Sequence, residues 1–297
     1  MKSLVHAEHE ALHSKMTSLS IRGTHFVWGE RPYVMGIVNV TPDSFSDGGR
    51  FFHVDDAVAH AERLIEEGAD ILDVGGESSR PFSAPVSTEE ELRRTVPVIQ
   101  AIRERSGIPI SVDTTKAEVA QACLDAGADM INDISALRMD SRMADVVREH
   151  GVPCVLMHMK GVPKDMQVNP FYADVEAEVR HFLEERIAFA RNAGIPSEKI
   201  IIDPGIGFGK RFQDNLVLLN RIDRLRALGY PVLVGPSRKA FLAAVTGIAR
   251  PDARDTATIG AVAVAALRGA DMVRVHSVQD IRMVLRVMTA IIKETME

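Results

Sequence analysis

Hydrophobic and polar positions follow a repeated order along this chain: a helical stretch ends at a glycine, two or three residues follow, and a short apolar run begins. Glycine commonly follows the last turn of a helix because it tolerates the left-handed backbone conformation. The predicted helix-ending glycines are Gly68, Gly107, Gly127, Gly151, Gly194, Gly229 and Gly269. The apolar runs, typical of strands buried on both faces, are Val34–Val38, Ile71–Val74, Ile108–Val112, Met130–Ile131, Val152–Met157, Ile200–Ile202, Val232–Val234 and Met272–Val275.

Eight apolar runs alternating with eight helical stretches predict an α/β fold, a closed (β/α)₈ TIM barrel. A doubly wound open sheet is the alternative, although such a sheet normally has fewer strands. Three helix-to-strand junctions resemble one another: E-E-G-A-D-I-L-D-V, D-A-G-A-D-M-I-N-D and L-R-G-A-D-M-V-R-V. Their unequal spacing indicates a reused junction and not a solenoid repeat.

Two short runs precede the first predicted barrel strand. Leu19–Arg22 and His25–Trp28 flank Gly23-Thr24, a pattern that predicts a small N-terminal hairpin able to close one end of the barrel. Residues 1–17 are interpreted as a flexible N-terminal tail. No linker rich in Pro, Gly or Ser interrupts the rest, so residues 18–297 are interpreted as a single domain.

Composition narrows the class of function. The net charge of −6 and the pI near 6.0 disfavour a general nucleic-acid binder, whose domains are usually basic, but leave room for a local cationic pocket. Cys123 and Cys154 lack metal-ligand spacing, and we expect both to be reduced core residues. No apolar run is long enough to span a membrane, and the N-terminus does not read as a signal peptide. Cytoplasmic localisation is therefore expected.

A long polar loop follows the first barrel strand. The stretch Val34–Phe52 begins as an apolar run and becomes sharply polar at Asn39. Ligands of parallel sheets and barrels bind beyond the carboxyl ends of the strands. The length of this loop, and Phe45 among polar neighbours, favour a functional loop over a simple turn. Two other long connections, 160–172 and 246–254, are candidate lids.

Polar residues follow every predicted strand, and in a barrel they would meet at one mouth because parallel strands all end on the same side. Each residue alone could be a helix cap or a turn, but eight polar strand ends together predict a site. The residues are Asn39; Asp73, Gly75, Gly76, Glu77, Ser78, Ser79 and Arg80; Asp113; Asn132 and Asp133; His158; Asp203, Gly205, Gly207 and Gly209; Ser237, Arg238 and Lys239; and Arg274 and His276.

These strand-end residues divide by charge. Carboxylate and amide oxygens suit a flat heterocycle with several N–H donors, and they belong to Asp113, Asn132 and Asp203. Cationic side chains suit phosphate oxygens, and this group is Lys239, Arg274, His276 and Arg80. Hard oxygen ligands for Mg²⁺ could come from Asn39 with Asp43 or Asp47. The pattern predicts a substrate with an amide-rich ring at one end and phosphates at the other.

Two attractive motifs fail. D-P-G-I-G-F-G-K is not a phosphate-binding Walker A loop, because Pro204 stands where its first glycine should be and Arg211 where Ser or Thr should follow Lys210. It is interpreted as a glycine loop in which Phe208 can pack on a ligand. Lys239 could belong to a Schiff-base aldolase, but the neighbouring Arg238 favours a binding cation.

The ordered motifs resemble the dihydropteroate synthase family of pterin-binding enzymes, from Val34 to the C-terminus. They are N-V-T-P-D-S-F-S-D-G-G from Asn39, G-G-E-S-S-R-P from Gly75, S-V-D-T at Ser111, I-N-D-I at Ile131, M-H-M at Met157, D-P-G-I-G-F-G-K from Asp203, S-R-K at Ser237 and R-V-H at Arg274. The resemblance implies Mg²⁺-dependent condensation of 6-hydroxymethyl-7,8-dihydropterin diphosphate with p-aminobenzoate. The products are 7,8-dihydropteroate and pyrophosphate, in folate biosynthesis, and sulfonamides inhibit the family.

The resemblance also implies roles for individual residues. The pterin ring would be bound by Asp113, Asn132, Ile134, Asp203 and Lys239. The pyrophosphate would be held by Asn39, Ser79, Arg80, Arg274 and His276, with Asn39 also a Mg²⁺ ligand. The p-aminobenzoate pocket would be framed by Phe45, Pro81, Phe208 and Ser237, and the catalytic groups would be Asp47, Lys239 and Arg274.

Two rival interpretations are a methyltetrahydrofolate-dependent methyltransferase and a non-catalytic pterin-binding paralogue. The first would not need the S-R-K and R-V-H cations, and the second would be expected to lose Asn39, Lys239 or Arg274, all of which are present. The expected partners are small-molecule substrates, with neither nucleic acid nor membrane. The family is often dimeric, and the amphipathic stretch Ile281–Ile292 could serve a homodimer.

Overall fold

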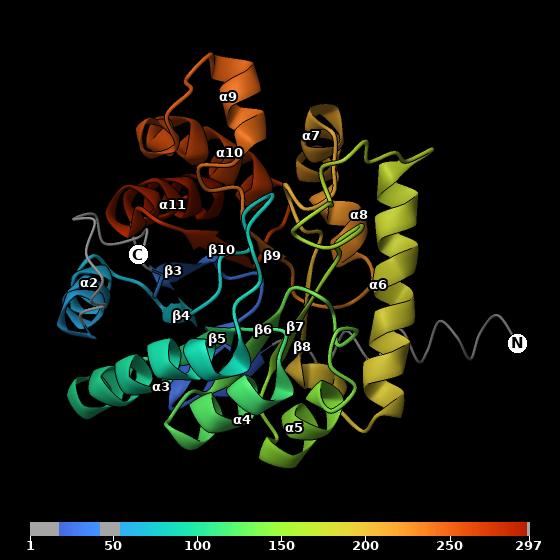
Figure 1. Ribbon diagram of the computed structural model, residues 1–297. Helices are drawn as coiled ribbons and strands as arrows, with labels where there is room; N and C mark the ends of the chain where they lie inside the picture. Colours follow the sequence, from blue (N-terminus) through green and yellow to red (C-terminus); the bar gives the residue numbers. More distant parts are fainter. Residues whose placement is uncertain (1–17, 42–53, 296–297) are drawn as a thin grey trace, which may run out of the picture.

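The eight apolar runs form eight parallel strands that close into a barrel in this computed structural model, which describes residues 18–41 and 54–295 (Figure 1). The hydrogen-bonded order is β8-β7-β6-β5-β4-β3-β10-β9, and a parallel bridge from Ile202 to Val232 joins its two ends. The predicted barrel is confirmed, and the open sheet is wrong. The strands are β3 (Tyr33–Asn39), β4 (Ile71–Gly75), β5 (Ile110–Asp113), β6 (Met130–Asp133), β7 (Cys154–Met157), β8 (Ile200–Asp203), β9 (Leu233–Val234) and β10 (Met272–Val275).

Helices surround the strands (Figure 1). They are α2 (Val54–Glu66), α3 (Thr88–Arg105), α4 (Ala117–Asp125), α5 (Met143–His150), α6 (Val175–Asn192), α7 (Phe212–Asn220), α8 (Ile222–Arg226), α9 (Ala240–Thr246), α10 (Asp255–Leu267) and α11 (Val278–Lys293), with 3₁₀ turns η1 (Ser197–Lys199) and η2 (Pro251–Arg254). Six of the seven predicted helix-ending glycines have positive φ, from 59° at Gly151 to 111° at Gly127. Gly107 does not, because α3 ends at an extended Ser106 whose N–H bonds the Ile102 carbonyl.

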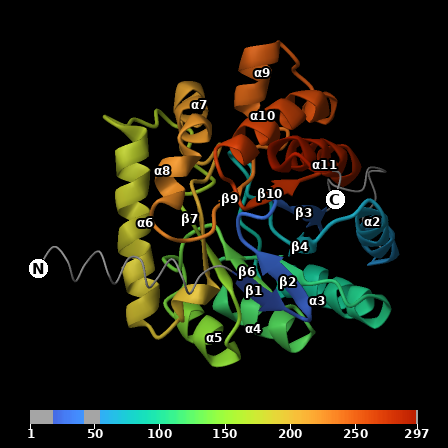
Figure 2. The same ribbon diagram turned by 180° about the vertical axis from the view of Figure 1, so that it is seen from behind.

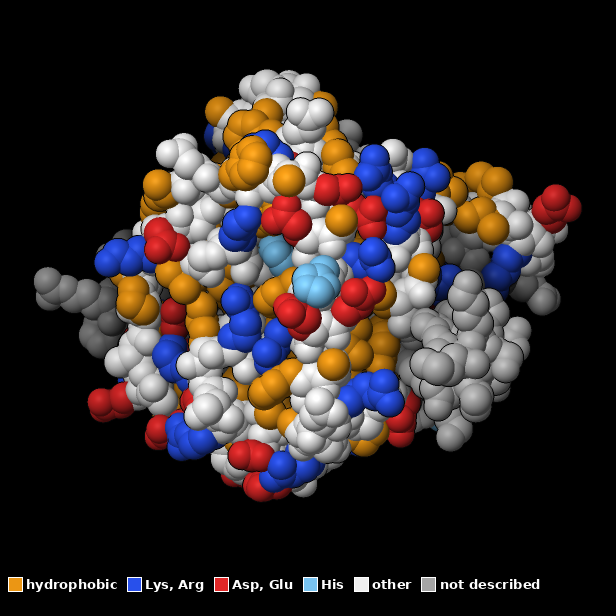
Figure 3. Space-filling view, turned by 90° about the vertical axis from the view of Figure 1, so that its right-hand side faces the viewer, with side chains coloured by type: hydrophobic (Ala, Val, Ile, Leu, Met, Phe, Trp, Pro, Cys, Tyr) orange, Lys and Arg blue, Asp and Glu red, His pale blue; other side chains and the backbone are white. Residues whose placement is uncertain are grey.

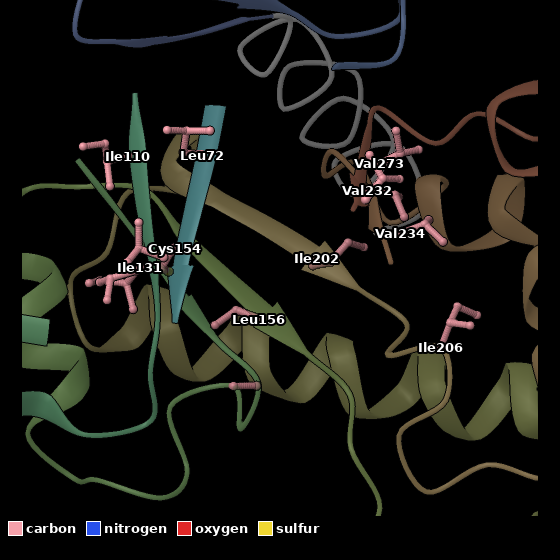
Figure 4. Close-up of a cluster of buried hydrophobic side chains, with 14 of the residues drawn as sticks. Leu72, Ile110, Ile131, Cys154, Leu156, Ile202, Ile206, Val232, Val234 and Val273 are labelled. Atoms are coloured by element: carbon pink, nitrogen blue, oxygen red, sulfur yellow. The ribbon is translucent and has the colours of Figure 1, made fainter. Parts of the chain in front are cut away.

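Alternate residues of each strand face opposite ways, which explains why the strands are apolar throughout. In β3, Val34 belongs to the large core between strands and helices, part of which is shown in Figure 4. The flanking residues Tyr33 and Met35 instead belong to a separate cluster inside the barrel. Both faces of β3 are inaccessible to solvent, because Val34 and Met35 are each 0% exposed.

The predicted N-terminal hairpin is present as antiparallel strands β1 (Ser18–Ile21) and β2 (Thr24–Val27). It lies across the end of the barrel at which the strands begin (Figure 2). Phe26 is completely buried there, in one cluster with Met130 and Met272, the first residues of β6 and β10. The hairpin therefore closes the amino end of the barrel with apolar side chains.

The three G-A-D junctions are structural clamps at the same amino end. Each aspartate donates its N–H to a carbonyl of the neighbouring strand, at 2.7–2.9 Å, and accepts that residue's own N–H on its carboxylate, at 2.8–3.1 Å. The pairs are Asp70 with Val34, Asp129 with Ile110, and Asp271 with Val232. Arginines neutralise the carboxylates: Arg31 and Arg282 at Asp70, Arg22 and Arg103 at Asp129, and Arg226 at Asp271.

The outward face of α6 mixes basic and acidic side chains (Figure 3). Arg180 on this helix pairs with Glu184 at 2.8 Å and with Glu176 at 3.7 Å. Within residues 18–41 and 54–295, no helix is both long and apolar enough to cross a membrane.

The two long connections predicted as lids are attached to their surroundings. After β7, the Tyr172 hydroxyl donates to the Gly209 carbonyl at 2.6 Å. Before α10, the Arg254 guanidinium donates to the Arg238 carbonyl at 2.9 Å. These bonds anchor the far end of each connection, and movement of the lids stays a prediction. The predicted tail 1–17 lies outside the described residues.

Candidate active site

Polar residues from neighbouring strands form one tier at the carboxyl end of the barrel. Strand register pairs Asn39 with Gly75, Gly75 with Asp113, and Asp113 with Asn132. On the other side of the barrel, Asp203 ends β8 in register with Met157. The sequence builds this tier because β3, β5, β6 and β8 each change from apolar residues to Asn or Asp at their carboxyl ends.

Arg274 is the hub of this tier. Its Nε lies 2.5 Å from Asp73 Oδ2, and its Nη2 lies 2.9 Å from Asp113 Oδ2. The Asn132 amide donates to the same Asp73 oxygen at 2.9 Å. Arg274, grouped by its charge with the phosphate-binding cations, therefore lies in contact with the acids. One guanidinium can serve two carboxylates because its N–H groups form a planar fork.

The two carboxylates of this hub, those of Asp73 and Asp113, form ion pairs with the same cation, Arg274. Burial raises the pKa of Asp113 to about 7, with Arg274 opposing and Asp73 adding to the rise. Asp73 Oδ1 is buried and has no hydrogen-bond partner within the described residues. Two buried carboxylates sharing one cation favour an added proton or a ligand that brings N–H donors. A nitrogen-rich ring would supply such donors.

Asp203 and Lys239 complete the same region. Asp203 Oδ1 accepts the Gly205 N–H at 2.6 Å. Burial raises the pKa of Asp203 to about 6, and this hydrogen bond and the nearby cations oppose the rise. Burial lowers the pKa of Lys239 to about 8, with Arg274 adding to the fall and the Asp203 and Asp113 carboxylates opposing it. The side chains of Asp113, Asn132, Asp203 and Lys239 are thus brought together, although their roles stay predictions.

Phe208 links the glycine loop to Lys239. The Lys239 Nζ lies 4.1 Å from the centre of the Phe208 ring, a favourable cation–π contact. Phe208 also belongs to a small apolar cluster with Ile134, and its other members are Met157, Met159 and Met166. The predicted ring-packing residues Ile134 and Phe208 therefore lie on one apolar wall beside the charged tier.

His276 is a neutral hydrogen-bonding group in this structure and not the cation that its sequence context predicts. Burial lowers its pKa to about 3, and Arg238, Arg274, Lys239 and Arg80 add to the fall. The His276 backbone N–H donates to Ser237 Oγ at 3.2 Å, and the same oxygen lies 2.9 Å from His276 Nδ1, in a hydrogen bond whose direction depends on the ring tautomer. In the tautomer in which the Ser237 hydroxyl donates to Nδ1, the ring proton is on Nε2, where it can be donated to a ligand.

The loop after β4 carries three further predicted residues. Ser79 is half-buried, and Arg80 and Pro81 are exposed. Arg80 is close enough to depress the pKa values of Lys239 and His276. The Phe82 N–H donates to the Pro163 carbonyl at 3.0 Å, which joins this loop to the one after β7.

Asn39 meets the simplest requirement for a Mg²⁺ ligand. It ends β3 with a half-buried side chain that makes no hydrogen bond within the described residues. A neutral amide oxygen is a hard ligand that suits Mg²⁺ when substrate phosphates and water complete its shell. No group of three or more His, Cys, Asp and Glu able to hold a metal occurs in 18–41 and 54–295. The predicted residues Asp43, Phe45 and Asp47 lie outside the described residues.

Sequence reasoning gave no role to two parts of this site. Asp73 is a predicted polar strand end, but its sequence context assigns it no contact with Arg274. The signal that could have indicated a special role is the presence of an aspartate inside the buried run Ile71–Val74. Lys210 is only 2% exposed, and its Nζ lies 3.0 Å from His158 Nδ1. The sequence placed Lys210 in a glycine loop but carried no signal that its side chain turns inward.

Two surface hollows, of about 650 Å³ and 460 Å³, lie away from the strand ends. The larger is lined by α3 and α4 residues such as Leu92, Val96 and Glu118, and the other by residues such as Asp174, Arg211 and Arg221. Neither contains a member of the Arg274 hub. The candidate site is therefore located by the convergence of buried charges and not by these hollows.

Comparison with known proteins decides the family. A family model described as pterin binding enzyme matches residues 35–276. The dihydropteroate synthase of Synechocystis sp. is 45% identical over 273 residues, which cover 92% of this chain and 94% of that protein. The chain belongs to the dihydropteroate synthase family. It is therefore a transferase of the dihydropteroate synthase type. The interpretations as a methyltetrahydrofolate-dependent methyltransferase and as a Schiff-base aldolase are both wrong.

Solved structures of family members superpose closely on this one. Dihydropteroate synthase from Xanthomonas albilineans in complex with 7,8-dihydropteroate has a TM-score of 0.84 at 48% identity, over 92% of this chain and 98% of that one. The Yersinia pestis dihydropteroate synthase in a sulfonamide drug complex has a TM-score of 0.88 at 39% identity, over 94% of this chain and 100% of that one. The family resemblance found in the motifs is thus confirmed over nearly the whole chain.

Proposed function

We propose that this chain condenses 6-hydroxymethyl-7,8-dihydropterin diphosphate with p-aminobenzoate, in a Mg²⁺-dependent reaction that yields 7,8-dihydropteroate and pyrophosphate. The observation that carries the proposal is the Arg274 hub, in which Asp73 and Asp113 share one partly buried guanidinium beside Asn132. Such a hub, next to Asp203 and Lys239, combines acceptors for ring N–H groups with cations for phosphate.

The pterin ring would bind at the buried acceptors. Asp203 and Asp113 could each accept further hydrogen bonds from N–H groups of the ring. The Asn132 side-chain nitrogen donates to Asp73, which would leave the side-chain oxygen to accept from the ring. Lys239 would donate to a ring acceptor from above the Phe208 face. Ile134 would pack against the ring edge from the same apolar wall. Burial strengthens these contacts because no water competes for the carboxylates.

The diphosphate would lie toward Arg274, Arg80 and His276. With the Ser237 hydroxyl donating to Nδ1, the neutral His276 ring would carry its proton on Nε2 and would donate one hydrogen bond without adding a full charge. The exposed Arg80 and the half-buried Ser79 would complete the contacts from the loop after β4. Competition between phosphate oxygens and the Asp113 carboxylate for Arg274 would free Asp113 to accept from the ring.

The bond that breaks joins the methylene carbon to the diphosphate oxygen, and the bond that forms joins this carbon to the arylamine nitrogen. The nitrogen then loses one proton, which water or the departing pyrophosphate can accept. An arylamine is already a neutral nucleophile near pH 7, so the barrier lies mainly in departure of the leaving group. Lys239, Arg274 and the His276 donor would stabilise the charge that develops on pyrophosphate. Mg²⁺, bound with the Asn39 oxygen, would neutralise further phosphate charge. Asp47, predicted as a catalytic group, lies outside the described residues.

The p-aminobenzoate pocket would be framed by Phe45, Pro81, Phe208 and Ser237. Phe208 is 7% exposed and Ser237 is 5% exposed, so a ligand reaching both would be largely shielded from water. Phe45 lies outside the described residues. A sulfonamide would occupy the same place and compete with p-aminobenzoate.

A homodimer and a cytoplasmic location complete the proposal. Ile281 and Leu285 of α11 pack against the barrel, whereas other apolar side chains of α10 and α11 are exposed: Leu267 64%, Met283 54%, Val287 60%, Ile291 70% and Ile292 62%. A second copy could cover this face, and sedimentation of the Val287→Asp variant would test it. Both cysteines are buried free thiols, as a reducing compartment requires.

The deciding experiment mixes the pure protein with Mg²⁺, dihydropterin diphosphate and p-aminobenzoate, and measures pyrophosphate and dihydropteroate together. Equal amounts of both products, lost when Mg²⁺ is chelated, are expected. Omitting p-aminobenzoate should abolish both products. Pyrophosphate released without the arylamine would contradict the proposal, because it would indicate a hydrolase. A sulfonamide should raise the apparent KM for p-aminobenzoate and leave kcat unchanged.

A further inference from the structure

Lys210 is an unusual buried cation behind the candidate active site. Its side chain is 2% exposed, and it makes no ion pair within 4.0 Å in residues 18–41 and 54–295. Burying an ammonium without a carboxylate in contact is unfavourable unless its hydrogen bonds are satisfied. Such a group is retained only where its position or its charge has a use.

The three N–H groups of Lys210 meet three acceptors. Its Nζ lies 3.0 Å from the Phe208 carbonyl oxygen, 3.0 Å from His158 Nδ1 and 3.3 Å from the His158 carbonyl oxygen. Burial, together with the Lys210 charge, lowers the pKa of His158 to about 2. The imidazole is therefore neutral, and Nδ1 accepts from the ammonium. Lys210 thus ties the loop after β8 to the end of β7.

Backbone contacts make this tie tight. Gly205 has a φ of 67° and Gly209 a φ of 61°, and a Cβ at Gly205 would overlap the His158 carbonyl oxygen. A Cβ at Gly209 would overlap the Lys160 carbonyl oxygen in the same way. Only glycine lets the two loops approach this closely. The Lys210 side chain then occupies the space behind them.

The loop after β8, which the Lys210 side chain ties to the end of β7, makes two contacts within the candidate site. At one end the Gly205 N–H donates to Asp203 at 2.6 Å. At the other, Phe208 places its ring 4.1 Å from the Lys239 Nζ. Movement of this short loop would therefore displace the donor at Asp203 and the ring beneath Lys239 together.

We propose that Lys210 is a positioning residue for the synthase reaction, fixing the loop after β8 against His158 and keeping Asp203 ionised by its positive charge. The inference rests on the proposed role of Asp203 in binding the pterin ring. Lys210 touches neither substrate nor reacting atoms, and its effect on catalysis is transmitted through Asp203 and Phe208.

The electrostatic part of this role predicts a pH signature. Asp203 is buried, and the groups that favour its charged form are the Gly205 N–H, Lys210, Lys239 and Arg274. Burial lowers the pKa of Lys210 to about 7, with the Lys239 charge adding to the fall and the Asp203 and Asp214 carboxylates opposing it. Removing the Lys210 charge should therefore raise the pKa of Asp203, by about one unit for a cation beyond contact distance.

The test compares Lys210→Met with Lys210→Arg and with Lys199→Met as a matched control. Lys199 also donates to a backbone carbonyl, that of Gly151, but it precedes β8 at the opposite end of the barrel. The pH dependence of kcat/KM for dihydropterin diphosphate is measured from pH 6 to pH 8. Thermal unfolding of each variant is recorded alongside, to separate loss of fold from loss of function.

For Lys210→Met, kcat/KM relative to the unaltered protein should be lowest at pH 6 and recover by roughly fivefold at pH 8, as a one-unit pKa shift requires. The recovery follows because Asp203 ionises in both proteins at pH 8 and Lys210 itself loses its charge there. Lys210→Arg should show no such recovery, because the charge is kept. A deficit in Lys210→Met that is equal at pH 6 and pH 8, or equal recovery in Lys210→Arg, overturns the electrostatic role, and kcat/KM equal to that of the unaltered protein at pH 8 overturns the role in fixing the loop. Failure of the proposed function is distinct, because the unaltered protein would then make no dihydropteroate.

Discussion

The two ends of the barrel use the same side chains for opposite purposes. At the amino end, Asp70, Asp129 and Asp271 each accept a backbone N–H and are neutralised by one or two arginines. At the carboxyl end, Asp73 and Asp113 share Arg274, and Asp73 Oδ1 has no hydrogen-bond partner among residues 18–41 and 54–295. The amino-end carboxylates, which have full hydrogen-bond and arginine partners, stabilise the fold. The carboxyl-end carboxylates, which have fewer partners, lower the stability but can bind a ligand.

The largest expected effect is loss of a cation at the carboxyl end. Arg274→Ala and Lys239→Ala should each lower kcat/KM by about 10²–10³-fold, because charge developing on the leaving group loses a preorganised partner. Steady-state assays with both substrates measure this. As the amino-end control, Arg282→Ala should change kcat/KM by less than about twofold, since Arg31 still pairs with Asp70. Near-normal turnover in either carboxyl-end variant would contradict its assignment.

Asp203→Asn should act on binding more than on chemistry. The amide keeps one acceptor but loses the charge, so the dissociation constant for dihydropterin diphosphate should rise by about 10–100-fold. Titration calorimetry measures the constant, and a circular dichroism spectrum like that of the unaltered protein is the control for folding. Unchanged affinity would rule out Asp203 as a ring acceptor.

Asp129→Ala should show the reverse pattern at the amino end. The change leaves the Ile110 N–H without its carboxylate and releases Arg22 and Arg103. The free energy of unfolding should fall by about 2 kcal/mol, as measured by urea denaturation. Under conditions where the variant is folded, kcat should be unaltered. A fall in kcat without a fall in stability would show that the two ends are not separable.

The smallest expected effect is a change in how stability depends on pH. Folded Asp113 keeps its proton up to about pH 7, whereas an unfolded aspartic acid loses it near pH 4. Raising the pH therefore removes a proton that the folded state binds more tightly, and stability falls. Asp113→Asn lacks this titration, so its stability relative to the unaltered protein should rise by about 1 kcal/mol per pH unit between pH 5 and 7. A pH-independent difference in unfolding free energy would contradict the raised pKa.

The sequence by itself determined the barrel and the group of polar residues at the carboxyl ends of its strands. The eight strands were predicted because each apolar run is too short to form a helix. Their order around the barrel follows because βα connections between parallel strands are right-handed. The tier of Asn39, Asp113, Asn132 and Asp203 follows as well, because all parallel strands end on one side. The G-A-D repeats were visible too, but their role as clamps was not.

Only the tertiary structure decided how the charges pair. Arg274 lies 201 positions from Asp73 and 161 from Asp113, and no local pattern indicates which of several acids a distant arginine meets. It also decided that His276 is neutral and that Lys210 turns inward. Pairing and protonation depend on distance and burial in three dimensions, whereas strand and helix periodicity is set by neighbours in the chain.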